Sequence, residues 1–171
     1  MIDEIYSKDI LRLAADLPHA GRLELPQGSG ERTAKLCGSR AVVDVKIGRR
    51  GEVEHFAQDV KACALGQAAA SIVGANAVGT DLTEARAARD AMRAMLKSGG
   101  EGPTGRFEGL RILKPVADYP ARHASTMVAI EALCDAIEDA ITRRLTWSPP
   151  YYAEPSWEEQ EAERTRGAGA A

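Results

Sequence analysis

The sequence predicts an α+β fold in which helices pack on a small antiparallel sheet of about three strands. Residues 41–47 alternate apolar and polar side chains, and a second strand-like run at 53–60 follows the turn Gly48-Arg49-Arg50-Gly51. Two extended runs around a glycine-containing turn are typical of a β-hairpin. Apolar residues at helical spacing over 2–17 and 120–145 predict a helix before the hairpin and a long one after it.

The register of this hairpin follows from its turn. If the turn centres near residue 50, partners have numbers that sum to about 100, as in any antiparallel pair. Ile47 then faces Val53 and Lys46 faces Glu54, which pairs apolar with apolar and cation with anion. We expect a third strand from either 31–37 or 22–25, with a glycine-rich turn at 28–30 between them.

Two further helices are predicted after the hairpin. Small residues dominate 63–77, and small side chains allow a helix to approach a sheet closely. Asp81 and Glu84 resemble a capping box that opens a helix running to about Lys97. Gly99 and Gly100 end it, and 99–109 is expected to be a loop. Together these elements predict one domain over 1–145, followed at 146–171 by a mobile tail that is acidic and contains prolines.

Composition narrows the class of protein. The 171 residues are 44% hydrophobic and 27% charged with a net charge of −3, which is ordinary for a globular domain. We expect no nucleic-acid partner, because basic residues and aromatics are not clustered. We expect no membrane association, because no apolar run approaches about 20 residues. The acidic start of the chain lacks the features of a signal peptide, which favours a cytoplasmic location.

Two of the three cysteines form the candidate site. The hairpin register places Cys37 opposite Cys63 at the open end of the strands. Cys63 opens a predicted helix, where the helix dipole favours the thiolate that binds metals or attacks sulfur. Gly38 allows a sharp turn that leaves Cys37 accessible. The alternative is that both cysteines are small buried hydrophobes. The absence of a C-x-x-C motif argues against a zinc finger.

A closed metal site needs more than two thiolates, because zinc and iron–sulfur sites commonly have four protein ligands. The remaining candidates are Ser39, Asp59, His123 and Ser125. His123 is the best of these for zinc or iron, and the alternative is a half-exposed polar residue at the start of a helix. Cys134 belongs to the apolar stripe of the last helix and is expected in the core.

These blocks in this order resemble the NifU/IscU/SufU family of iron–sulfur cluster scaffold proteins. The resemblance rests on Cys37-Gly38-Ser39-Arg40, on Lys61-Ala62-Cys63 before a small-residue helix, and on Tyr119-Pro120-Ala121-Arg122 before the last helix. It implies an α+β fold with a site of three cysteines and one aspartate. It also implies a non-enzymatic scaffold that receives sulfur from a cysteine desulfurase, builds a cluster and passes it to acceptor proteins. Some members bind zinc at the same place.

The chain departs from this family pattern at two ligand positions. Ser39 stands where the family has aspartate, and Ser125 stands where it has the third cysteine. Serine hydroxyls are poor ligands for iron or zinc near neutral pH. A Cys37–Cys63–His123 site with one open position is chemically reasonable. A cluster shared across a homodimer, with two cysteines from each chain, is equally so.

Three functions remain open at this point. The first is a scaffold that binds iron, an iron–sulfur cluster or zinc through Cys37 and Cys63. The second is an accessory partner of a cysteine desulfurase, which accepts persulfide on Cys63 and holds no cluster. The third is an interaction module that keeps the fold and has lost the chemistry, as the two serines suggest. A hydrolase is not supported, because no nucleophile elbow or Ser-His-Asp set can be placed.

Overall fold

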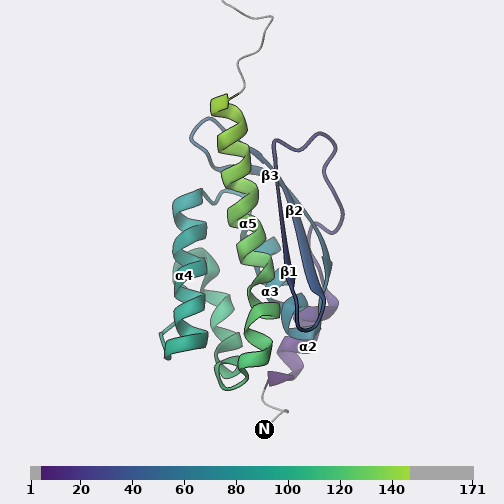
Figure 1. Cartoon of the computed structure of the whole chain (residues 1–171), viewed down its shortest axis with the longest axis vertical. Helices are drawn as coiled ribbons and strands as arrows, with labels where there is room; N and C mark the ends of the chain where they lie inside the picture. The colour runs from purple at the N-terminus through teal and green to yellow at the C-terminus, as the bar shows by residue number, and fades with distance from the viewer. Residues whose placement is uncertain (1–4, 147–171) are drawn as a thin grey trace, which may run out of the picture.

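The fold is described by a computed structural model that covers residues 5–146 (Figure 1). The helices are α2 (Lys8–Ala15), α3 (Ala64–Asn76), α4 (Leu82–Ser98) and α5 (Pro120–Thr146), with the 3₁₀ helix η1 (Gly105–Asp118) before α5. The strands are β1 (Gly28–Ala34), β2 (Ser39–Ile47) and β3 (Val53–Lys61). The predicted tail lies outside the described residues except for Thr146, which ends α5.

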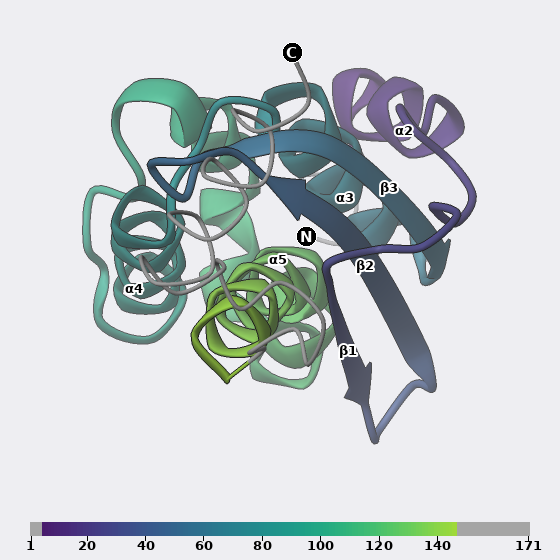
Figure 2. The same cartoon turned by 90° about the horizontal axis from the view of Figure 1, so that it is seen from above.

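The three strands form one antiparallel sheet in the order β1-β2-β3. Seen from above, α5 lies along β1 and β2, and α4 lies on the side of α5 away from the sheet (Figure 2). Helix α3 packs beside α5, and α2 packs on α3. The predicted α+β fold with a three-stranded sheet and covering helices is confirmed. Among residues 5–146, none of the helices combines the length and apolar character needed to cross a membrane.

The hairpin register is confirmed at one pair and wrong at the next. Ile47 faces Val53 as predicted, but Lys46 faces His55 instead of Glu54. A bulge between Lys46 and Ile47 shifts the partner by one residue. The remaining pairs, down to Arg40 opposite Lys61, keep the shifted register.

The expected turn at 28–30 is wrong, because these residues begin β1. Gly28 pairs with Val45 and Gly30 with Val43. Both glycines lie directly under α5. A Cβ on Gly28 would come within 2.1 Å of the Ala136 carbonyl oxygen, and one on Gly30 within 2.2 Å of the Ala132 carbonyl oxygen. Glycine is needed here for the close approach of helix and strand and forms no turn.

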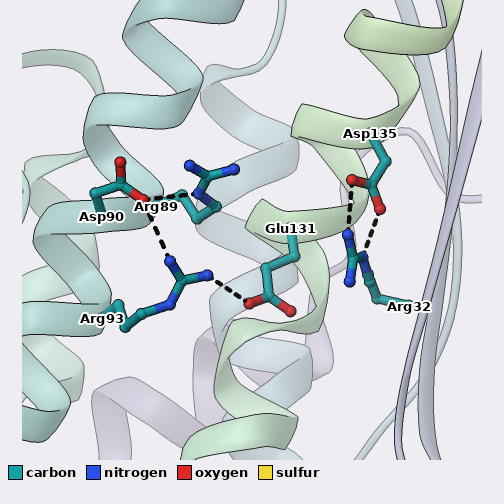
Figure 3. Close-up of polar contacts among 6 residues, drawn as sticks. All are labelled: Arg32, Arg89, Asp90, Arg93, Glu131 and Asp135. Carbon is teal, nitrogen blue, oxygen red and sulfur yellow. Dashed lines mark hydrogen bonds and ion pairs between the residues drawn. The ribbon is translucent and has the colours of Figure 1, made fainter.

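Ion pairs join α5 to its neighbours on both sides (Figure 3). Arg32 of β1 donates to Asp135 at 2.8 Å, and Arg93 of α4 donates to Glu131 at 3.0 Å. Exposed pairs of this kind contribute only about 0–1 kcal/mol each. They orient α5, whereas most of its stabilisation comes from buried residues such as Leu133 and Ile137.

The helix ends agree with the sequence in some places and differ in others. The Asp81 carboxylate accepts from the Glu84 N–H at 2.8 Å, so the predicted cap of α4 is confirmed. Helix α2 begins only at Lys8, where Ser7 caps it.

The predicted loop 99–109 ends early, because η1 begins at Gly105. Every third side chain of η1 is buried, as the 3₁₀ period of about three residues requires; these are Phe107, Leu110, Leu113 and Val116.

We predict that Gly30→Ala lowers the free energy of unfolding by about 1–3 kcal/mol, because the new methyl group must push α5 off the strand. Urea unfolding would show a lower midpoint at an unchanged slope. The control is Gly48→Ala, whose new Cβ would have as its three nearest atoms the movable carboxylate ends of Glu52 and Glu54. Equal midpoints for the two variants would contradict close packing at β1.

Candidate metal and sulfur site

Cys37 and Cys63 lie at one open cavity of about 390 Å³. Cys37 sits in the turn between β1 and β2, and Cys63 caps the N-terminus of α3 immediately after β3. The hairpin therefore brings together two thiols 26 positions apart, as its register predicted. Six further residues complete the lining, which is Gly38, Ser39, Val60, Lys61, Ala62 and Gln67.

Ser39 links the two cysteines through a single hydroxyl group. Its Oγ accepts from the Cys37 thiol at 3.1 Å and from the Cys63 backbone N–H at 3.2 Å. The side chain is buried at the start of β2, so its position is fixed by the sheet. When Cys37 ionises, the same hydroxyl can rotate and donate to the thiolate.

Ser125 reaches the same site from the first turns of α5. The Cys63 thiol donates to its Oγ at 3.5 Å, and that hydroxyl donates to the Arg122 carbonyl oxygen at 2.9 Å. The contact depends on Gly66 of α3, because a Cβ there would lie 2.8 Å from the Ser125 carbonyl oxygen. The small residues predicted to pack on a sheet therefore also bring α3 close to a helix.

The Cys37 and Cys134 thiols differ in their readiness to ionise. The Ser39 hydroxyl, helped by the Ser39 backbone N–H, holds the pKa of the exposed Cys37 below its ordinary value. Burial raises the pKa of Cys134 to about 11. Cys134 lies inside the core, as its place in the apolar stripe predicted, and is inert there.

Two of the predicted ligands lie away from the cysteines. His123 Nε2 is 3.1 Å from each of the carbonyl oxygens of Val116 and Ala117, and the ring lines a different groove, between α4 and α5. Residues two apart on a helix point about 200° apart, so His123 and Ser125 cannot both face Cys63. Asp59 pairs with Val42 within the sheet and does not line the cavity.

The described residues of one chain therefore offer two good ligands. Over residues 5–146, no three His, Cys, Asp or Glu side chains are placed to hold a metal ion together. Ser39 and Ser125 occupy the places next to the thiols, and their hydroxyls bind soft metals poorly. A Cys37–Cys63–His123 site is not formed.

The sequence interpretation missed Gln67. It lies on α3 one turn after Cys63, and its Nε2 donates to the Val60 carbonyl oxygen at 3.4 Å. Within the described residues, its buried Oε1 has no hydrogen-bond partner. The i, i+4 spacing from Cys63 could have identified it, because such residues share one face of a helix.

Comparison with known proteins agrees with this fold. The chain belongs to the NifU-like N terminal domain family, which it matches over residues 5–126. The resemblance inferred from the cysteine, hairpin and helix blocks is thereby confirmed. None of the curated proteins compared with the chain matches it.

Solved structures share the fold. A nitrogen-fixing NifU-like protein (N-terminal) from Brucella abortus is 44% identical, with a TM-score of 0.80, over 83% of this chain and 98% of that one. A protein described as a candidate iron–sulfur cluster assembly scaffold for the SUF system of thermophilic Fervidobacterium islandicum AW-1 is 19% identical. Its TM-score is 0.70 over 78% of this chain and 96% of that one. At this identity the likeness concerns the fold alone.

We predict that Ser39→Ala slows alkylation of Cys37 severalfold near neutral pH. Loss of the hydroxyl raises the pKa of Cys37 and lowers its thiolate fraction. Iodoacetamide labelling over a pH series, resolved by peptide mass spectrometry, measures this rate. Ser125→Ala should slow it less, since Ser125 contributes less to the shift. Equal rates in wild type and Ser39→Ala would contradict the role of Ser39.

Proposed function

We propose that this protein is a non-enzymatic scaffold of iron–sulfur cluster assembly, which binds iron, a cluster or zinc through Cys37 and Cys63. The observation that carries the proposal is the convergence of both thiols on one open cavity, with Ser39 and Ser125 beside them. Membership of the NifU-like family supports it. So does the lowered pKa of Cys37, because the thiolate is the form that binds metal.

Two thiolates are too few for a cluster with four cysteine ligands. Two copies of the chain, facing each other at this cavity, would supply four. The thiol of Cys37 lies in an exposed turn, so a second chain can approach it. We therefore propose that a loaded form is a homodimer whose cluster lies between the two copies. An open site of this kind also suits a cargo that comes from a cysteine desulfurase and leaves to an acceptor protein.

The exposure of Cys37 supports a second function, as a sulfur acceptor. The thiolate would attack the outer sulfur of a persulfide on the desulfurase. A new S–S bond then forms on this chain, the bond within the donor persulfide breaks, and the donor leaves as a thiolate. Cys63 was the expected acceptor from the sequence, and the lowered pKa of the exposed Cys37 makes it a second candidate. No metal is needed for this exchange.

We predict that Cys37→Ala and Cys63→Ala each abolish metal or cluster loading, because either change leaves one thiolate. Anaerobic reconstitution with iron and sulfide, followed by metal analysis and visible absorption, measures loading. Addition of zinc alone tests the other cargo. The control is Cys134→Ala, which removes a thiol from the core and none from the cavity. Loading that persists in both site variants would refute the scaffold.

The two functions are separated by desulfurase turnover with and without this protein. The acceptor function would be favoured if the wild-type chain binds no metal but stimulates desulfurase turnover. It should then also gain about 32 Da, the mass of one sulfur atom, on Cys37 or Cys63. Absence of loading, stimulation and adduct together would leave an interaction module.

We further predict that Ser125→Cys increases metal loading, because it places a third thiol at the atom that now lies 3.5 Å from the Cys63 sulfur. Adding Ser39→Asp should increase loading again, since a carboxylate is a better ligand than a hydroxyl. The matched control is Thr126→Cys, one residue along the same buried turn. The zinc affinity of each variant, measured at equal protein concentration, checks the predicted order: wild type lowest, then Ser125→Cys, then Ser125→Cys with Ser39→Asp. Equal affinity of Ser125→Cys and Thr126→Cys would show that position 125 is not part of the site.

A further inference from the structure

A second surface feature lies at the other end of the sheet from the cysteines. A groove of about 700 Å³ runs between the segment that leads into β1 and the last turns of α5. It is lined by Leu25, Pro26, Gln27, Ala140, Arg143 and Arg144. Figure 1 shows that β1 begins beside the C-terminal end of α5, whereas the β1–β2 turn with Cys37 lies at the opposite end.

Leu25 lines this groove with an exposed side chain and an uncommon backbone conformation. Its side chain is 88% exposed, and its backbone adopts a φ of 50°, which is uncommon for a residue other than glycine. Gln27, two residues later, fixes the segment to β2. The Gln27 N–H donates to the Val45 carbonyl oxygen at 2.9 Å, and its Oε1 accepts from the Ile47 N–H at 2.7 Å. The fold thus presents an apolar side chain to solvent at a cost in backbone strain.

Arginines border the groove on the side of the β2–β3 turn. Arg144 donates to the carbonyl oxygens of Gly48 and Ile47, each at 2.8 Å. Among residues 5–146, Arg144 has no carboxylate partner, while Arg143 pairs with Asp139. Arg49 and Arg50 are exposed in the adjoining turn, where Glu52 pairs with Arg50. An apolar floor beside Arg144, which lacks a carboxylate partner among residues 5–146, suits an occupant that is both aromatic and acidic.

The chain itself carries a segment of this chemistry directly after α5, whose last turns line the groove. Residues 147–157 follow the last residue of α5 and contain both tryptophans of the protein, two tyrosines and three prolines. Glutamates then cluster over 158–163. Ala140 lies only about 9 Å back along the helix axis from Thr146, the last residue of α5, at about 1.5 Å per residue. We propose that residues 147–163 fold back on the groove, with aromatic side chains over Leu25 and Pro26 and glutamates beside Arg144.

Tryptophan fluorescence of the full chain tests this docking directly, because Trp147 and Trp157 are its two tryptophans and both belong to the proposed occupant. We expect wild type to show blue-shifted emission and partial protection from acrylamide. Leu25→Asn should reduce the ratio of docked to free segment by about tenfold. This factor corresponds to the free energy gained when roughly one leucine side chain is buried. Asparagine tolerates the positive φ, so the fold is retained.

The matched control is Leu36→Asn, which changes a leucine that is 82% exposed at the cysteine end of the sheet. Its fluorescence should equal that of wild type. Tryptophans that are fully accessible in wild type, or equally protected in Leu25→Asn, would overturn the proposal. Protection that disappears on dilution, together with a change in sedimentation, would also overturn it and assign the groove to a second copy of the chain.

Discussion

The close contact between α5 and β1 is the constraint on which the rest of this structure depends. Gly28 and Gly30 leave no side chain between the helix and the strand, so α5 lies against the sheet backbone. Gly66 plays the same part where α3 meets α5. These contacts fix the start of α5 and thereby place Ser125 beside Cys63. A bulkier residue at any of the three glycines would displace the site as well as weaken the core.

The candidate site combines two thiols with two hydroxyl groups. Two thiols meet at the end of the sheet, and the hydroxyls of Ser39 and Ser125 lie beside them. Each hydroxyl contacts one of the thiols. Ser39 favours the thiolate of Cys37, and Ser125 accepts from Cys63. Such a site would suit the proposed weak or shared binding of a metal and the proposed exchange of sulfur.

The two ends of the sheet carry different surfaces. The end with the β1–β2 turn holds the thiols and an open cavity, and the end with the β2–β3 turn holds an apolar groove bordered by arginines. Docking of the chain's own C-terminal segment at the groove would leave the thiols open to partners. The length of the strands keeps these surfaces apart, because each residue of β2 advances about 3.3 Å.

Local patterns in the sequence determined the α+β class, the cap at Asp81, the hairpin and the meeting of Cys37 with Cys63, because each depends on residues near in sequence or on the two-residue period of a strand. Only the tertiary structure decided that Gly28 and Gly30 form a strand, since the reason lies in a helix about a hundred residues later. The tertiary structure also decided that His123 faces away from the thiols. The helix-start pattern marked both 123 and 125 as candidates, and only the rotation of α5 against its neighbours selects which one faces the cysteines.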